Sequence, residues 1–329
     1  MSETYFLTGA LGCIGAWVTK TIVERGDVPV VFDLSDDPAD RRRLSDVIAP
    51  DDLARVRFVR GDVTDATAVH RAVESSGAKR LIHLAGLQVP FCKADPALGA
   101  RVNVLGTIHV FEAAKAVGAE RVVYASSAAV YGFEEDAPAP DESAALEPAT
   151  HYGVFKRANE GTADIYFRDD GLSSAGLRPL TVFGVGRDQG MTSGPTSAMK
   201  AAVLGRPFEI AFRGPTDFHY VRDTAEAFVA CADRAPEGAR IYNLHGETAT
   251  VEHVVELIAE ALPETRGSIT ATGTPIPIAP ELDGGSIHRE VGGLRTTTLV
   301  DGVHETLERF RALAEDGRLD TRDLDRTGG

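Results

Sequence analysis

Residues Thr8-Gly9-Ala10-Leu11-Gly12-Cys13-Ile14-Gly15 decide the fold of this chain of 329 residues. The apolar run Tyr5–Thr8 predicts a short β-strand that leads into this stretch. Apolar side chains recur at three- and four-residue spacing in Ile14–Arg25, which predicts an amphipathic helix after it. A glycine-rich turn in this position typically binds the pyrophosphate of a dinucleotide.

Each glycine of the turn has a separate physical task. Gly9 permits the tight turn, Gly12 lets the backbone approach a pyrophosphate, and Gly15 lets helix and strand pack closely. The phosphates then lie at the positive end of the helix dipole. We therefore expect the backbone around Gly12 to bind the cofactor, through all of the turn residues Gly9, Leu11, Gly12, Cys13, Ile14 and Gly15.

Short apolar runs alternate with helical patterns through the first 130 residues, with further strands expected at Val28–Asp33, Val56–Arg60, Arg80–Leu84 and Arg121–Ala125. This alternation predicts an α/β fold with a doubly wound parallel sheet of the Rossmann type. Residues 171–184 predict one more strand. We expect residues 1–184 to form the dinucleotide-binding domain and residues 185–329 to form mainly a smaller substrate lobe, with elements such as 218–246 returning to the main domain.

The ends of the expected strands carry further cofactor candidates. Asp33 ends the second strand, where a carboxylate can accept both hydroxyls of the adenosine ribose. Residues 34–37 offer no cation for a 2′-phosphate, and Arg41–Arg43 are expected on a solvated helix face, so NAD is favoured over NADP. At the ends of the third and fourth strands, we expect cofactor contacts from Asp62, Val63, Leu84, Ala85 and Gly86.

Tyr152 and Lys156 lie four residues apart, on one face of an expected helix. A nearby lysine favours the phenolate of a tyrosine, which can then remove the proton from an alcohol. The spacing alone also fits a core tyrosine beside a snorkelling lysine. Ser127 follows the fifth strand and supplies a hydroxyl that can stabilise charge on a substrate oxygen. We therefore predict Ser127, Tyr152 and Lys156 as catalytic residues.

Bulk properties exclude several classes of function. A net charge of −15 and a pI near 5.1 argue against a nucleic-acid partner. Three scattered cysteines favour a reducing compartment over a disulfide framework. No apolar run is long enough for a membrane helix, and the glycine motif begins too early for a signal peptide. We expect a cytoplasmic protein that binds no membrane.

Taken together, the motifs closely resemble the extended short-chain dehydrogenase/reductase family, the NAD-dependent epimerase/dehydratase group. Its segments occur in the family's order: TGALGCIG, Asp33, GDVTD, HLAG, VNVLGT, YASSAAVYG, YGVFK and LRPLTVFG. The resemblance extends over roughly residues 4 to 315 and implies bound NAD, with Asn103 among its contacts. It also implies a homodimer formed through a four-helix bundle, by the helices around 94–117 and 152–168.

Departures from the family pattern narrow the chemistry. Dehydratases of the family have an acidic pair where this chain has Ala128 and Ala129, and the related decarboxylases have a glutamate at the second position. Nucleotide-sugar enzymes of the family usually have an arginine at the position of Thr216. They usually have a second arginine in a later segment, which in this chain is 269–286 and contains no arginine or lysine. Because a diphosphate depends on such cations, a UDP- or GDP-sugar is disfavoured, although Arg187, Arg206 or Arg213 can substitute.

These observations predict an NAD-dependent oxidation of a secondary alcohol on a small carbohydrate-like molecule: a free sugar, sugar acid or polyol. The product is either released or reduced again as its epimer. The alternatives are a UDP-sugar 4-epimerase and, in another class, a non-catalytic NAD-binding sensor or scaffold. Substrate contacts are expected from Gln88, Ser126, Ser127, Thr181 and Arg187, and no metal site is expected.

Overall fold

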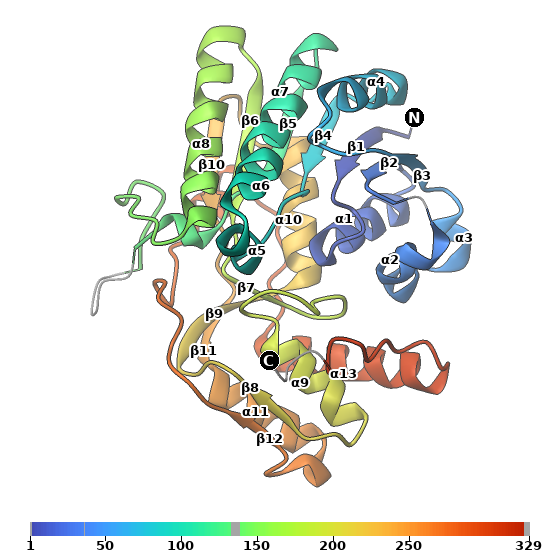
Figure 1. The fold of residues 1–329 in the computed structure, drawn as a ribbon, viewed down its shortest axis with the longest axis vertical. Helices are drawn as coiled ribbons and strands as arrows, with labels where there is room; N and C mark the ends of the chain where they lie inside the picture. The colour runs from blue at the N-terminus through green and yellow to red at the C-terminus, as the bar shows by residue number, and fades with distance from the viewer. Residues whose placement is uncertain (1, 36, 133–138, 326–329) are drawn as a thin grey trace.

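The computed structural model describes residues 2–35, 37–132 and 139–325. Its central sheet has seven parallel strands in the order β10-β6-β5-β4-β1-β2-β3 (Figure 1). The predicted α/β fold with a doubly wound parallel sheet is confirmed. The bounds of the strands are β1 (Thr4–Thr8), β2 (Val28–Asp33), β3 (Arg57–Arg60), β4 (Arg80–His83), β5 (Arg121–Ala125), β6 (Ser173–Arg178) and β10 (Ala239–Asn243).

Both faces of the sheet are covered by helices, which is why its strands are almost continuously apolar. In β1, Tyr5 and Leu7 enter a core shared with α1 (Cys13–Glu24) and α10 (Val221–Arg234). Phe6 points to the opposite face, into a core shared with three other helices. Those helices are α4 (Ala66–Ser76), α7 (Gly106–Ala116) and α8 (His151–Asp170).

A second group of elements continues from the end of β6 and lies below the sheet in Figure 1. It contains a sheet of order β11-β9-β7 and the parallel pair β12-β8. Strand β10 and helix α10 belong to the main body, where β10 pairs with β6 and α10 packs on α1. The bounds are β7 (Thr181–Phe183), β8 (Phe208–Ile210), β9 (Pro215–Tyr220), β11 (Glu247–Thr250), β12 (Ile269–Ala271), α9 (Gly194–Val203), α11 (Val251–Ala261), α12 (Gly285–Glu290) and α13 (Leu299–Glu315).

The expectation of one strand over residues 171–184 is wrong. The structure divides this segment into β6 and β7, which belong to different sheets. Pro179 lies at the break and has no N–H group to donate to a ladder. The chain therefore leaves the central sheet at Pro179 and starts the second sheet at Thr181.

Shorter elements join these layers, and several of them border the site. They are α2 (Arg42–Val47), α3 (Pro50–Leu53), α5 (Val89–Ala94), α6 (Pro96–Ala100), the π-helical turn η2 (Arg101–Leu105) and the 3₁₀ turns η1 (Pro38–Arg41), η3 (Ala128–Val130) and η4 (Pro263–Thr265). Among the described residues, none of the helices combines the length and the apolar composition that a bilayer-spanning helix requires.

Candidate active site

The glycine-rich turn forms a cradle in which two of the glycines leave no room for a side chain. Gly9 has φ +71°, and a Cβ atom there would lie 2.4 Å from the backbone nitrogen of Ala85. A Cβ on Gly15 would lie 2.4 Å from the carbonyl oxygen of Gly9. Gly12 caps α1 without a side-chain hydrogen bond, so the first N–H groups of the helix remain available to a ligand. This geometry fits the pyrophosphate of a dinucleotide.

Asp33 lies beside this turn at the end of β2. Its carboxylate accepts the N–H groups of Leu11 at 3.0 Å and Leu34 at 2.8 Å. Burial raises the pKa of the Asp33 carboxyl, and the two backbone hydrogen bonds partly oppose that shift. A carboxylate has about four acceptor positions, so these two contacts leave capacity for ribose hydroxyls.

The arginines expected on a solvated helix face are in contact with other parts of the chain, which corrects that prediction. Arg43 forms an ion pair with Asp188 and donates to the carbonyl oxygen of Leu11 at 3.1 Å. Arg42 pairs with Asp320, and Arg41 stacks over the ring of Phe58. Their acidic partners are distant in sequence and become neighbours only when the chain folds. The Arg43 guanidinium next to Asp33 is therefore already engaged by Asp188.

The ends of β3 and β4 place the other cofactor candidates. Asp62 accepts the N–H of Thr64 at 2.8 Å and is exposed, while Val63 is buried against Gly106. Leu84 and Ala85 contact the end of β1, since their N–H groups donate to the carbonyl and hydroxyl oxygens of Thr8. A Cβ on Gly86 would lie 3.7 Å from Nζ of Lys156. The end of β4 therefore brings the cofactor-binding candidates to the catalytic candidates.

Asn103 is almost completely buried in the π-helical turn η2. Its amide oxygen accepts the N–H of Leu87 at 2.7 Å, and its amide nitrogen donates to the carbonyl oxygen of Leu87 at 2.9 Å. Its own carbonyl accepts from Asn159 of α8. The side chain thus holds the segment after β4 in place, directly beside Gly86.

Ser127, Tyr152 and Lys156 converge at the carboxyl ends of β4 and β5. Thr150 caps α8 through the N–H of Gly153, which places Tyr152 in the first turn of the helix. Lys156 follows one turn later, is 6% exposed, and donates to the carbonyl oxygen of Ala125 at 2.6 Å. Its Nζ lies 5.4 Å from the centre of the Tyr152 ring.

The pKa values in this group are set by burial and by the neighbouring side chains. Burial raises the pKa of the Tyr152 phenol, while a hydrogen bond with Ser127 and the charge of Arg187 act to lower it. Burial lowers the pKa of Lys156 to about 8, against a smaller upward influence of Cys92 and Glu160. Lys156 thus remains largely protonated at neutral pH, with its ammonium 5.4 Å from the centre of the Tyr152 ring.

A buried ion pair lies next to the catalytic trio, as we call Ser127, Tyr152 and Lys156. Glu160 lies one turn after Lys156 on α8, and its two oxygens accept from Arg178 of β6 at 2.7 and 2.6 Å. The Ser126 hydroxyl donates to Glu160, so it points away from Ser127 into the interior. Consecutive residues at a strand end face opposite sides, which separates the two serines. Sequence reasoning missed Glu160, although the spacing of Tyr152, Lys156 and Glu160 places all three on one helix face.

Thr181 does not join the catalytic group either. Its hydroxyl is fully buried and shares a hydrogen bond of 2.8 Å with Thr216 of β9. The position expected to hold an arginine in nucleotide-sugar enzymes is therefore a threonine whose hydroxyl already has a partner. Arg213 and Arg206 form exposed ion pairs with Glu252 and Asp325.

Gln88 and Arg187 lie together beside Gly190. Gln88 caps α5, and Arg187 lies in the loop between β7 and α9. The side-chain oxygen of Gln88 lies 2.2 Å from the point that a Cβ on Gly190 would occupy, and Nη2 of Arg187 lies 3.2 Å from the same point. The structure therefore brings Gln88 and Arg187 together with Ser127, Tyr152 and Lys156, but places Ser126 and Thr181 elsewhere.

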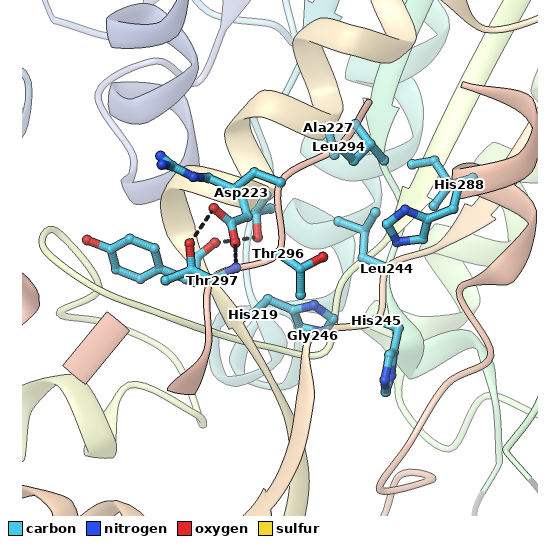
Figure 2. A pocket seen from close by; sticks show the side chains of 14 residues that line it. His219, Asp223, Ala227, Leu244, His245, Gly246, His288, Leu294, Thr296 and Thr297 are labelled. Atoms are coloured by element: carbon cyan, nitrogen blue, oxygen red, sulfur yellow. Dashed lines mark hydrogen bonds between the residues drawn. The ribbon is translucent and has the colours of Figure 1, made fainter. Parts of the chain in front are cut away.

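A hollow with an empty volume of about 430 Å³ contains none of the predicted site residues (Figure 2). His219, Asp223, His245 and Thr297 are among its lining residues. Behind it, the fully buried Asp217 accepts the N–H of Gly246 and pairs with Nδ1 of His245 at 3.0 Å. That hydrogen bond raises the pKa of His245, whereas burial lowers the pKa of His219.

No cluster of three or more His, Cys, Asp or Glu side chains with a metal-binding arrangement occurs in the described part of the chain.

Comparisons with known proteins agree with this geometry. The sequence model described as "NAD dependent epimerase/dehydratase family" matches residues 5–244. A UDP-glucose 4-epimerase from Mycolicibacterium smegmatis is 27% identical, over 93% of this chain and 97% of the relative. A D-erythronate dehydrogenase from Cupriavidus necator is 28% identical, over 77% of this chain and 80% of the relative.

Among solved structures, the UDP-glucose 4-epimerase of Thermus thermophilus in complex with NAD is similar. It has a TM-score of 0.80 and 25% identity, and the match covers 94% of this chain and 99% of that one.

Proposed function

Because the chain belongs to the NAD dependent epimerase/dehydratase family, within the extended short-chain dehydrogenase/reductase group, we propose that it oxidises a secondary alcohol on a small carbohydrate-like substrate. Membership makes it an NAD-dependent enzyme, so the role of a non-catalytic scaffold is set aside. The observation that carries the proposal is the convergence of three side chains: Ser127 lies near enough to the Tyr152 phenol to lower its pKa, and the Lys156 ammonium lies 5.4 Å from the centre of the Tyr152 ring.

NAD⁺, when bound, supplies the acceptor for the hydride that leaves the substrate carbon. The glycine cradle and the free N–H groups at the start of α1 suit its pyrophosphate, and Asp33 suits its adenosine ribose. Lys156, whose Nζ lies 3.7 Å from the Cβ position of Gly86 among the cofactor candidates, is proposed to hold the nicotinamide ribose. The full set of proposed contacts is Gly9, Leu11, Gly12, Cys13, Ile14, Gly15, Asp33, Asp62, Val63, Leu84, Ala85, Gly86, Tyr152 and Lys156, with Asn103 acting through Leu87.

The protein's own part of the reaction is proton transfer. Tyr152, as the phenolate, takes the proton of the substrate hydroxyl while the carbon–oxygen double bond forms. Ser127 donates to the same substrate oxygen and stabilises its developing charge. Lys156, held on the Ala125 carbonyl, keeps a positive charge near the phenolate. The hydroxyl thus becomes a carbonyl, and Tyr152 later releases the proton to solvent.

The substrate we favour is a free sugar, a sugar acid or a polyol. A diphosphate needs well-placed cations, and the three arginines that can substitute for the missing pair differ in availability. Arg206 and Arg213 are engaged with Asp325 and Glu252, whereas Arg187 faces the trio. The relative named D-erythronate dehydrogenase supports this choice, because D-erythronate is a small sugar acid.

The second candidate is a UDP-sugar 4-epimerase, which is favoured by the relatives named UDP-glucose 4-epimerase. The two candidates differ in whether NADH accumulates. A dehydrogenase releases NADH with a ketone or lactone, whereas an epimerase reduces the intermediate again. Absorbance at 340 nm during incubation with NAD and a panel of aldonates, free sugars and UDP-sugars tests the proposal. Low-micromolar binding of UDP or UDP-glucose by calorimetry, with epimerisation and no NADH, would overturn the preference.

The proposal includes a homodimer, based on the exposed apolar side chains of one region. Phe91, Leu98, Leu105, Val154 and Ile165 belong to α5, α6, η2 and α8, and each is between 38% and 51% exposed. Helices α5 and α6 pack on α8, so these elements form a continuous region of the surface. Pairing with a second copy would remove this apolar surface from water.

Two further parts of the proposal concern organisation and location. The division into residues 1–184 and, mainly, 185–329, with elements such as 218–246 returning to the first part, is supported by the passage to the second sheet after Pro179 and by the pairing of β10 with β6. A cytoplasmic location is supported by Cys13, Cys92 and Cys231, which are free thiols. Limited proteolysis, with cleavage sites expected between the two groups of elements, and fractionation of the native host test these two points.

A further inference from the structure

The loop between β7 and α9 carries Arg187 and is fastened to the cofactor-binding side of the molecule. The indole N–H of Trp17 donates to the carbonyl oxygen of Val185 at 3.0 Å. Asp188 pairs with Arg43, which also donates to Leu11 in the glycine-rich turn. These contacts on both sides hold the Arg187 backbone close to α1, and a hydrogen bond to Thr192 orients its guanidinium.

Arg187 has no carboxylate within ion-pair distance among the described residues. Its Nη2 donates to the Thr192 hydroxyl at 3.0 Å, but its Nε is buried and has no hydrogen-bond partner within the described chain. The adjacent Asp188 is no counter-ion for it, because Arg42 and Arg43 engage that carboxylate from the other side. This half-buried guanidinium therefore keeps a positive charge that no acidic side chain of the described residues balances.

The surroundings of Arg187 include a second polar group without a partner among the described residues. Gln88 contributes a second buried polar atom without a partner in the described chain, its side-chain oxygen, next to Gly190. Gly190 has φ +97°, and a side chain there would collide with Gln88. On its other side, Arg187 is close enough to Tyr152 for its charge to influence the phenol. The unpaired guanidinium thus lies beside an unsatisfied amide oxygen, and its charge acts on the phenol of the catalytic base.

We propose that Arg187 is the receptor for a substrate carboxylate, so that the substrate is a sugar acid whose carboxylate binds Arg187 while a nearby hydroxyl faces Tyr152. This inference rests on the proposed oxidation and names its substrate class. The guanidinium fork matches a carboxylate in a bidentate manner, and the unpaired side-chain oxygen of Gln88 beside it can accept a hydrogen bond from a hydroxyl of the same substrate. In the reaction a C–H bond and an O–H bond break, and a C=O bond forms. The hydride goes to NAD⁺ and the proton to Tyr152, which leaves a keto acid.

The position of Arg187 also allows a different role, contact with the cofactor diphosphate, because its loop lies close to Cys13 at the start of α1. The two roles predict different losses when the guanidinium is removed. A carboxylate receptor affects acidic substrates alone, whereas a diphosphate contact affects NAD binding and therefore every substrate.

The test compares Arg187→Met and Arg187→Lys with the wild-type enzyme. Arg213→Met is the matched control, since Arg213 belongs to the same lobe but forms an exposed pair with Glu252. The probes are D-erythronate, D-gluconate and D-glucuronate, each beside its neutral counterpart, erythritol, D-glucitol or D-glucose. The readouts are kcat/KM from NADH formation, binding of each acid to the NAD-loaded protein by calorimetry, and the Kd of NAD.

We expect the wild-type enzyme to prefer an acid to its neutral counterpart by about a hundredfold or more, because two charge-assisted hydrogen bonds are at stake. Arg187→Met should lower kcat/KM for the acid by about 10²–10³-fold, chiefly through KM, with Arg187→Lys in between. The Kd of NAD should change by less than about threefold, and Arg213→Met should behave as wild type.

Four results would overturn the inference: no binding of any acid by the wild-type enzyme, an unchanged KM for the acid in Arg187→Met, equal losses on acidic and neutral substrates, or a matching loss of NAD affinity. Tyr152→Phe separates these from a failure of the proposed function. If Tyr152→Phe is inactive while Arg187→Met is normal, the carboxylate receptor is wrong and the catalytic trio stands. If Tyr152→Phe retains turnover, the trio itself is wrong.

Discussion

Replacing Glu160 with glutamine removes the negative charge that faces the buried guanidinium of Arg178. Both oxygens of Glu160 accept from Arg178, at 2.7 and 2.6 Å, and the two side chains are only 7% and 2% exposed. Removal of one partner from a buried ion pair costs about 3–5 kcal/mol, because the remaining charge stays desolvated without compensation. Glutamine keeps the shape and one acceptor oxygen, so we expect a loss of about 3 kcal/mol in the free energy of unfolding.

Urea denaturation of Glu160→Gln, followed by circular dichroism, measures this loss. Ser126→Ala is the matched control, because it removes one hydrogen bond to Glu160 without removing a charge, and should cost about 1 kcal/mol. The double variant Glu160→Gln/Arg178→Met should be more stable than Glu160→Gln alone, since it also removes the stranded charge. A Glu160→Gln variant within about 1 kcal/mol of wild type would refute the reasoning.

The same substitution should change the pH dependence of turnover. Burial lowers the pKa of Lys156 to about 8, and Glu160 acts to raise it. Without the carboxylate, Lys156 should lose its proton at a lower pH. The alkaline limb of the kcat profile should therefore move to lower pH in Glu160→Gln, and an unmoved limb would show that Glu160 does not affect Lys156.

Three further predictions concern separate parts of the molecule. Asp33→Asn should weaken NAD binding about tenfold and narrow the preference for NAD over NADP, measured by calorimetry with both cofactors; an unchanged ratio would remove Asp33 from cofactor selection. The pKa of His245 is raised by its pairing with Asp217, so protonated His245 stabilises the folded state. This stabilisation is fully present below about pH 6.5, the pKa of an unperturbed histidine, and it is lost as the pH rises through the raised pKa. Denaturation from about pH 5.5 to 8.5 should show this slope in the wild type but not in His245→Gln. Ile165→Glu should yield monomers by light scattering while the wild type is dimeric, and a monomeric wild type would contradict the dimer.

The central sheet was predictable because each of its elements is indicated by a sequence pattern of only a few consecutive residues. The glycine-rich turn, the apolar strands and the carboxylate at Asp33 are each interpretable within a few residues, and the structure places them as the pattern indicates. The break at Pro179 was missed because Pro179 and Leu180 interrupt a segment that is apolar on both sides. A proline interrupts a strand only where a neighbouring strand would accept a hydrogen bond from the N–H group that proline lacks. The position of that neighbouring strand is not given by the local sequence.

Contacts between distant segments explain what the sequence did not reveal about the site. The sequence alone does not distinguish the roles of Ser126 and Ser127, because both are serines at the end of one strand. The orientation of the chain after β5 directs the Ser126 hydroxyl to Glu160 and leaves the Ser127 hydroxyl near Tyr152. Arg43 meets Asp188 across 145 positions of sequence. Both contacts depend on tertiary structure, which residue spacing along a helix or strand does not specify.

The most direct test of the central claim is NADH formation by Tyr152→Phe and wild type, with the NAD affinity of both proteins measured on the same samples. We expect turnover to fall by about 10²–10⁴-fold, because phenylalanine cannot accept the proton, while the Kd of NAD changes by less than about threefold. Turnover within about tenfold of wild type would contradict it, because another group would then have to remove the proton.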